Sequence, residues 1–473
     1  MPRHKMPDVM VLLPGITGSV LKRNGKVEWG FSASTIGKAL FTLGGSMEKA
    51  LALPHDDPAV DDLGDGIVAD ALMPDLHLLP GIWKIDGYTK ISESIKASFD
   101  VTEGRNFFAF PYDWRRDNRV SARRLARAAH AWLAAWRQLS GNSEAKLILV
   151  GHSMGGLVSR YFLECLDGWK DTKALITFGT PYRGSLNALD ALANGIKKGP
   201  LDISTLARQL TALYQLLPVY ECYEAGSGAL VRVGETTGIP NVDPAKAAAA
   251  LAFHREIEAA VKSNQSLSQY RQSGYRIYPV VGVAQQTNLS ARLREGTVEM
   301  LQTYKGEALG GDGTVPRVSA IPIELSADPS SAMYAATQHG SLQNADPVIT
   351  QLTGVLSGFT LDLGDFKKPK TLSQKKGFGQ KRLSATAASL AKAYSLKPVI
   401  SRERCTGCEK CVRICPKKTI TMSRGKARVD SGHCIRCYCC LEICDSSAID
   451  LRRSLGGRAM VRMVERGSKG SGR

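Results

Sequence analysis

Cysteine is scarce over most of this 473-residue chain and crowded near its end. Only Cys165 and Cys222 precede residue 405, and the other nine of the eleven cysteines lie between residues 405 and 444. This distribution excludes a secreted protein held together by disulfides along its whole length. It indicates metal ligation in a reducing compartment, so we expect a cytoplasmic protein.

Long apolar runs are also missing. The apolar stretch at residues 9–13 stops at Pro14-Gly15 and is too short for the core of a signal peptide. Nothing elsewhere approaches the roughly 20 apolar residues of a membrane-spanning helix. With 43% hydrophobic residues, the chain has enough apolar side chains for a large buried core and a smaller second domain.

Acidic residues are rare after residue 364. Of the 62 Lys and Arg, 26 follow this point, but only 8 of the 44 Asp and Glu do, which leaves 36 of each sign before it. The net charge of +18 therefore belongs to the C-terminal part. This part has no stacking motif or recognisable nucleic-acid-binding fold, so we favour a solvated linker and predict no nucleic-acid partner. An acidic protein partner stays open.

Up to about residue 362, short apolar runs alternate with longer helical patterns, which is typical of an α/β sheet protein. The runs at 8–13, 146–150, 174–178 and 277–283 predict buried strands, and the patterns at 120–139 and 157–166 predict helices. Two segments, 31–79 and 185–273, interrupt this alternation, and we expect them to form caps over an active site. The second contains a predicted helix that begins at Pro244, with Asp243 as its N-cap.

A nucleophile elbow is indicated by Gly-His-Ser-Met-Gly-Gly at residues 151–156. The string follows a predicted strand and precedes a predicted helix, which is the context that the G-x-S-x-G motif requires. Ser153 is therefore the candidate nucleophile. Because a serine hydroxyl is a poor nucleophile at neutral pH, it needs a base, an acid that orients the base, and donors for the oxyanion.

The chain order Ser, acid, His of α/β-hydrolases leaves three histidines as candidate bases, since only His254, His339 and His433 follow Ser153. His433 lies among the cysteines, and His254 lies in the middle of the predicted cap helix, where we expect a surface role. His339 remains, although a loop histidine bound to backbone is the alternative interpretation. Asp312, in Gly-Gly-Asp-Gly-Thr-Val-Pro, is the candidate acid, with an Asx-turn as its alternative.

The oxyanion hole is expected to use two backbone N–H groups. One is that of Met154, directly after the nucleophile, and the other comes from the loop at residues 13–19, Leu-Pro-Gly-Ile-Thr-Gly-Ser. We assign the second donor to Ile16.

These residues together resemble the lecithin:cholesterol acyltransferase family over about residues 8–350. Besides the elbow and the loop at 13–19, the resemblance rests on Phe-Pro-Tyr-Asp-Trp-Arg at 110–115, Phe-Gly-Thr-Pro at 178–181, Gln-Leu-Leu-Pro at 215–218 and Gly-Asp-Gly-Thr-Val-Pro at 311–316. It implies an α/β-hydrolase fold and transfer of a fatty acyl group from a phospholipid or another ester to water or an alcohol, through an acyl-Ser153 intermediate. It also supports Asp312 and His339. Secreted members have a disulfide-closed lid near the N-terminus, which this chain cannot form, so peripheral membrane contact and a phospholipid substrate stay open.

The late cysteines form two copies of C-x2-C-x2-C-x3-C, which is the spacing of bacterial two-cluster ferredoxins. In that pattern the fourth cysteine of each run binds the other cluster. The first 4Fe-4S cluster is thus assigned to Cys405, Cys408, Cys411 and Cys444, and the second to Cys434, Cys437, Cys440 and Cys415. Two structural zinc sites are the alternative. Cys439 is spare.

The expected domain organisation is an α/β-hydrolase over residues 1–362, a basic linker at 363–398, a small α+β ferredoxin-like domain at 399–455 and a disordered tail at 456–473. The leading hypothesis is a serine esterase or O-acyltransferase whose iron–sulfur domain docks a redox partner or senses oxidation. The alternative is an electron-transfer protein in which the hydrolase fold is only a binding body. A third interpretation is that the two halves were joined without cooperating.

Overall fold

The computed structural model describes residues 3–30, 45–79, 83–85, 87–198, 201–226, 228–326, 332–360, 397–415, 419–434, 440, 444, 446 and 448–452. Contacts divide the chain into a first unit, Met1–Thr360, and a second unit, Leu361–Arg473. Nearly all of the predicted linker and the whole predicted tail lie outside the described residues.

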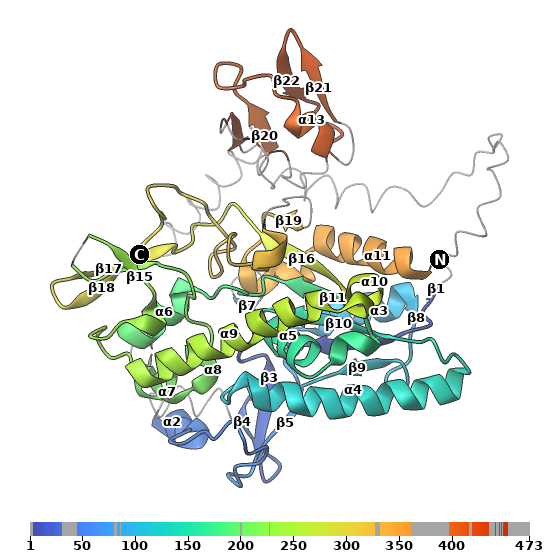
Figure 1. Cartoon of the computed structure of the whole chain (residues 1–473), viewed down its shortest axis with the longest axis vertical. Coiled ribbons are helices and arrows are strands. Elements are labelled where there is room, and N and C mark those ends of the chain that lie inside the picture. The colour runs from blue at the N-terminus through green and yellow to red at the C-terminus, as the bar shows by residue number, and fades with distance from the viewer. Residues whose placement is uncertain are drawn as a thin grey trace. The chain divides into compact units, whose positions relative to one another are not determined.

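Six strands form the central sheet of the first unit, in the order β19-β16-β11-β10-β2-β9, and every neighbouring pair is parallel (Figure 1). Their bounds are β2 Val9–Leu13, β9 Phe107–Ala109, β10 Leu147–His152, β11 Thr172–Phe178, β16 Arg276–Gly282 and β19 Met333–Ala335. The four predicted strands are confirmed. Strands β9 and β19 were not predicted, because they are only three residues each and carry little periodic signal.

Successive residues of these strands point to opposite faces of the sheet, as the pleat requires. In β10, Leu147 and Leu149 belong to one hydrophobic core, whereas Ile148 and Val150 belong to the other. Helices α4 (Asn118–Ser140) and α5 (Met154–Cys165) pack into the first core, and α3 (Thr89–Ser98) and α11 (Asp346–Thr360) into the second. The sheet is therefore covered on both faces, which is how parallel sheets satisfy their apolar strands.

The first predicted cap segment is tied to an antiparallel sheet in the order β4-β3-β5. Residues 31–44 of this segment lie outside the described part of the chain. The elements of this region are β1 His4–Lys5, β3 Ser19–Arg23, β4 Lys26–Trp29, α2 Gly45–Leu51, β5 Ile67–Leu72, β6 Leu76–Leu79, β7 Trp83–Ile85 and β8 Phe99–Asp100.

The second predicted cap segment is mostly helical. Its longest helix, α9 (Pro244–Ser266), begins as predicted, because the Asp243 carboxylate accepts hydrogen bonds from the backbone N–H groups of Ala245 and Lys246. The remaining described elements of the first unit are η1 Gly168–Asp171, α6 Leu186–Ala193, β12 Lys197–Lys198, β13 Leu201–Asp202, α7 Ser204–Gln209, α8 Thr211–Tyr214, β14 Tyr223–Glu224, β15 Leu230–Val231, η2 Val233–Glu235, α10 Ser268–Ser273, β17 Ser290–Arg294, β18 Thr297–Leu301, η3 Ile323–Leu325 and η5 His339–Asn344. Among the described helices, none is both long and apolar enough to cross a bilayer.

The Asp-Trp-Arg string holds the first cap segment in place. Arg115 is fully buried and donates to Asp113 and to Asp65, with an Nη2–Oδ2 distance of 2.7 Å to Asp65. The next residue, Arg116, donates to Asp56 Oδ1 at 3.0 Å and to three backbone carbonyls between residues 57 and 61. Buried charges are stable only when they are paired and hydrogen-bonded in this way. Arg115 and Arg116 together therefore hold residues 52–65 in place.

The second unit contains two antiparallel pairs, β20 (Lys397–Ile400) with β23 (Ile449–Arg452) and β21 (Ile420–Ser423) with β22 (Lys426–Val429), and a short helix α13 (Lys410–Ile414). Ile420 and Ile449, which are 29 positions apart, are both buried in its core with several cysteines. The mixed α and β content agrees with the small α+β fold expected for this part.

Candidate active site

Ser153 lies at the sharp turn between β10 and α5. Its backbone has φ 51° and ψ −124°, a conformation that L-residues rarely adopt and that costs on the order of 1–3 kcal/mol. The turn is packed against the loop after β2, because a Cβ on Gly15 would lie 2.9 Å from Ser153 Cβ. Position 15 therefore accepts only glycine. Ser153 itself is 5% exposed.

The structure brings the three predicted triad residues together. His339 Nε2 lies 2.9 Å from Ser153 Oγ, and His339 Nδ1 lies 2.7 Å from Asp312 Oδ2. With the Nδ1 proton directed at the carboxylate, Nε2 is the unprotonated nitrogen and accepts the hydrogen bond from the serine hydroxyl. This is the arrangement in which a serine can be deprotonated as it attacks.

The acid is held from its own turn. The second carboxylate oxygen of Asp312, Oδ1, accepts from the backbone N–H of Thr314 at 2.9 Å and of Val315 at 2.7 Å. The backbone N–H of His339 in turn donates to the carbonyl of Asp312 at 2.9 Å. Asp312 thus forms the Asx-turn considered as its alternative and also contacts His339, so the two interpretations are compatible.

Gly179 makes room for this pair. It has φ +56°, and a Cβ there would lie 2.7 Å from Asp312 Oδ2 and 2.9 Å from His339 Nδ1. A side chain at this position would therefore push directly into the Asp312–His339 hydrogen bond. The Phe-Gly-Thr-Pro string at the end of β11 thus has a local role beside the triad.

The two predicted oxyanion donors lie on the two segments that meet at Ser153. Met154 is the first residue of α5, where helix N–H groups have no partner within the helix. Ile16 follows Gly15, the residue packed against Ser153. Within the described residues, neither N–H donates to another backbone or side-chain oxygen. Both are therefore available to a substrate oxygen.

A buried histidine, His152, connects the loops that carry the candidate site residues, and nothing in the sequence indicated this role. Gly15 N–H donates to Tyr88 Oη at 2.7 Å, Tyr88 Oη lies 2.8 Å from His152 Nδ1, and His152 Nε2 lies 3.1 Å from the His339 carbonyl oxygen. A carbonyl can only accept, so Nε2 of His152 carries its proton and Nδ1 accepts from the tyrosine. Burial, with a smaller effect of His339, lowers the pKa of His152 to about 3, so this histidine is neutral near pH 7.

The two other candidate histidines pair with groups outside the triad. His433 is exposed and pairs with Asp430, with Nδ1 2.7 Å from Oδ2. His254 is not at the surface as expected: it is 4% exposed, and its Nε2 lies 2.8 Å from the Gln215 carbonyl. That expectation was wrong because α9 packs against α5 and α8, so the middle of the helix faces the core.

The second unit brings together the cysteines predicted for one cluster. Cys405 and Cys411 lie in one buried cluster, and Cys444 packs against it. Burial raises the pKa of the Cys411 thiol, and the nearby Cys444, Cys405 and Cys408 raise it further. Cys405 and Cys411 are buried, and Cys444 comes from the other copy of the repeat. The exchange of the fourth cysteine between copies is the ligand pattern of two-cluster ferredoxins.

The fourth cysteine of each run accepts a hydrogen bond from a backbone N–H group at the same position along the repeat. The N–H of Thr419 donates to Cys415 Sγ at 3.3 Å, and the N–H of Ala448 donates to Cys444 Sγ at 3.3 Å. Each donor is four residues after its cysteine. Such N–H···S bonds stabilise the negative charge of cluster thiolates and tune the potential.

The second cysteine set is only partly described. Cys434 and Cys440 are buried and Cys415 is half-buried, whereas Cys437 lies outside the described residues. Within the part of the chain that the structure describes, no three Cys, His, Asp or Glu side chains form a site for a single metal ion. Of the first set, Cys405 and Cys411 are buried, Cys408 is exposed, and the half-buried Cys444 accepts an N–H···S bond. These four thiols are the kind of donor set that a 4Fe-4S cluster uses.

Comparisons with known proteins agree with both sets of motifs. A family model for lecithin:cholesterol acyltransferase matches residues 83–235, and one for a 4Fe-4S dicluster domain matches residues 397–445. Both resemblances are confirmed. The dicluster match supports iron–sulfur cluster binding. The acyltransferase match includes Ser153 but ends before Asp312 and His339, so their roles rest on the geometry above.

Several solved structures are similar at low sequence identity. A Tle4-Tli4 complex contains a chain 15% identical, with a TM-score of 0.49, over 76% of this chain and 98% of that one. The mature lipase BlEst2 of Bacillus licheniformis is 14% identical, with a TM-score of 0.34, over 75% and 96%. The phospholipase PlaB of Legionella pneumophila, in complex with thio-NAD, is 12% identical, with a TM-score of 0.19, over 74% and 62%. The search of curated proteins found no match.

Proposed function

We propose that this protein is a serine-dependent acyl-ester hydrolase or O-acyltransferase with an appended iron–sulfur domain. The observation that carries the proposal is the hydrogen-bonded series Ser153, His339 and Asp312, with distances of 2.9 and 2.7 Å. The two candidate N–H donors, of Ile16 and Met154, support it.

In the proposed reaction, Ser153 Oγ attacks the ester carbonyl carbon while its proton passes to His339 Nε2. The carbonyl oxygen becomes an oxyanion that the N–H groups of Ile16 and Met154 stabilise. When the C–O bond to the alcohol breaks, the leaving oxygen takes the proton from Nε2, and an acyl-Ser153 ester remains. Water or a second alcohol then loses its proton to His339 as it attacks this ester, and Ser153 is released with its proton.

The acyl donor is proposed to be a lipid-like ester. The acyltransferase match supports a fatty acyl group, and the low exposure of Ser153, 5%, supports an enclosed site. The second cap segment contacts the acid turn directly: Ser185 Oγ donates to the Thr314 carbonyl at 2.5 Å, and Asn187 Nδ2 to the Gly313 carbonyl at 3.3 Å. Movement of this cap segment would therefore shift the turn that carries Asp312. We propose that the segment moves in this way at a lipid surface.

The second unit is proposed to hold two 4Fe-4S clusters, one with each of the predicted cysteine sets. When bound, the clusters supply reversible one-electron oxidation and reduction, which ester hydrolysis does not need. We propose that they dock the enzyme to a redox partner or report oxidation to it. A reducing cytoplasm is the proposed location. Cys165 and Cys222 are both free thiols, and burial raises the pKa of each, Cys165 to about 12, so neither readily forms a reactive thiolate.

The test is acyl-ester hydrolysis by anaerobically reconstituted protein, with Ser153→Ala as the matched control. Nitrophenyl esters of increasing chain length define the acyl preference, and added alcohol shows whether transfer competes with hydrolysis. A fluorophosphonate probe should label the native protein and not Ser153→Ala. Full activity of Ser153→Ala would refute the serine mechanism. We expect Ser153→Ala to lose ester hydrolysis, because the substitution removes the attacking oxygen.

The electron-transfer alternative makes the opposite prediction for the same protein. It expects redox cycling of the clusters with no labelling by the fluorophosphonate probe. Comparing ester hydrolysis in the oxidised and dithionite-reduced states tests the connection between the units. Equal activity in both states would favour two halves that do not cooperate.

A further inference from the structure

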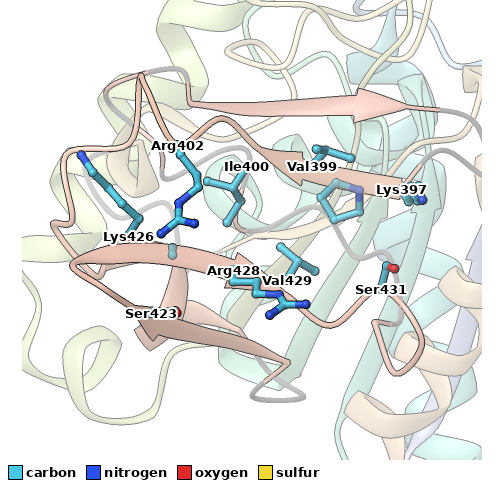
Figure 2. A pocket seen from close by; sticks show the side chains of 11 residues that line it. Lys397, Val399, Ile400, Arg402, Ser423, Lys426, Arg428, Val429 and Ser431 are labelled. Atoms are coloured by element: carbon cyan, nitrogen blue, oxygen red, sulfur yellow. The ribbon is translucent and has the colours of Figure 1, made fainter.

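A basic groove lies between the two strand pairs of the second unit. The groove is a cavity of about 320 Å³ between β20 and β22, which belong to different two-stranded sheets. Figure 2 shows its lining side chains. Four of its eleven lining residues are cations and none is acidic; the cations are Lys397, Arg402, Lys426 and Arg428. We call this cavity the basic groove.

No ion pair neutralises these four cations within the described part of the second unit. The carboxylates of that part whose ion pairs are known bind other groups: Asp430 pairs with His433, and Asp450 pairs with Arg404 at 2.6 Å. Arg402 and Arg428 are exposed. A cluster of like charges without counter-charges raises the local positive potential and attracts an anionic partner.

The cations are spread along the groove and do not converge on one point. Figure 2 shows Lys397 at one end and Arg402 and Lys426 at the other, with apolar side chains such as Val399 between them. A strand rises by about 3.3 Å per residue, so the ends of β20 are about 10 Å apart. A single phosphate cannot span this length. The arrangement fits an extended segment that presents several carboxylates with apolar residues between them.

One end of the groove touches the loop of the first predicted cluster. Lys426 Nζ donates to the Cys405 carbonyl at 2.5 Å, and the Cys405 N–H donates to the Ser401 carbonyl at 3.0 Å, beside Arg402. A protein bound in the groove would therefore lie beside Cys405, a predicted cluster ligand. This position suits an electron carrier better than a partner with no redox function.

We propose that the basic groove is the docking surface for an acidic electron-carrier protein. This inference deepens the proposed role of the second unit and is independent of the Ser153 chemistry. Charge complementarity would speed the encounter and weaken with salt, since surface charges are screened over about 8 Å at physiological ionic strength.

The test measures binding of the full reconstituted chain to a small acidic flavodoxin by fluorescence anisotropy. We expect Lys397→Glu and Arg428→Glu each to weaken binding at least about fivefold, because each reversal turns an attraction into a repulsion. Arg105→Glu, on an exposed turn of the first unit, changes the net charge equally and should alter affinity less than about twofold. Iron content and ester hydrolysis show that each variant is folded, and neither should change.

Carbodiimide cross-linking locates the contact, since it joins a lysine amine to a partner carboxylate with loss of water. Cross-links at Lys397 and Lys426 are expected. Three outcomes would each overturn the proposal. They are cross-links confined to the lysines between residues 367 and 392, equal effects of Arg105→Glu and the groove variants on affinity, and no binding of flavodoxin at low salt. Tighter, groove-dependent binding of a single-stranded DNA oligonucleotide, or displacement of flavodoxin by millimolar inorganic phosphate, would overturn it in favour of a different ligand.

Discussion

Tyr88 connects two catalytic loops, and its hydroxyl can be removed without changing the ring. Tyr88→Phe would break the hydrogen bond from Gly15 N–H and the one to His152 Nδ1, which measure 2.7 and 2.8 Å. Both partners are buried, and a buried polar group left without a partner costs about 1–3 kcal/mol. For the two groups together, the expected loss in the free energy of unfolding is therefore about 2–6 kcal/mol.

The same change should lower kcat. Without the tyrosine, His152 loses the bond that directs its Nε2–H to the His339 carbonyl, and the loop that carries Ile16 loses its anchor at Gly15. A misplacement of catalytic groups by about 1 Å can cost on the order of 100-fold in rate. We therefore expect kcat to fall about 10- to 100-fold at a temperature where the variant is folded, with a change in KM of less than about threefold.

Tyr112→Phe is the matched control. The Tyr112 hydroxyl is equally buried and donates to the Pro14 carbonyl at 2.8 Å, in the same loop, but it does not contact His152. It should lower the melting temperature and leave kcat within about threefold of the native value. If Tyr88→Phe and Tyr112→Phe lowered kcat equally, or if Tyr88→Phe changed only stability, the positioning role of Tyr88 and His152 would be refuted.

Three further predictions test the triad, the buried histidine and the clusters. Asp312→Asn removes the carboxylate that selects the His339 tautomer, so kcat for ester hydrolysis should fall by about 10³- to 10⁴-fold while the fluorescence spectrum of the folded protein is retained; a smaller loss than tenfold would exclude Asp312 as the acid. His152 has a folded pKa of about 3 against 6.5 when unfolded, so the unfolded chain binds the extra proton between these values and stability falls as pH falls through that window. At pH about 5 the loss is about 2 kcal/mol, and urea unfolding at pH about 7 and about 5 should show this loss for the native protein and a smaller one for His152→Gln; equal losses would contradict the assignment. Cys411→Ser should reduce the iron content of the reconstituted protein by about half, whereas Cys439→Ser should leave it unchanged, and the reverse result would reject the ligand assignment.

Much of the candidate active site could be predicted because its signals are local. The elbow at Ser153 is a turn encoded by neighbouring glycines, and Asp312 also lies in a glycine-rich turn. The positions of Asp312 and His339 after Ser153 then follow from chain order. The network of Tyr88 could not be found in this way, because its partners Gly15 and His152 are 73 and 64 residues away in the sequence.

The Asp-Trp-Arg string is a second case in which the local motif was found but its long-range contacts were not. It identifies a resemblance, but the string alone does not show that Arg115 and Arg116 bind the segment around Asp56 and Asp65. A buried arginine is recognisable only when its counter-charges are known, since arginine is usually exposed. The surface role expected for His254 was wrong for a related reason: the residues that cover α9 come from distant elements.

The sequence by itself determined the chemistry available to each unit: a serine elbow followed by an acid and a histidine, and two cysteine runs with ferredoxin spacing. These depend on short spacings and on residue types. The tertiary structure alone decided which groups meet, including Cys411 with Cys444, Tyr88 with His152, and the four cations of the basic groove. Such contacts depend on how strands and helices pack together, and packing brings together residues whose separation along the chain carries no local signal.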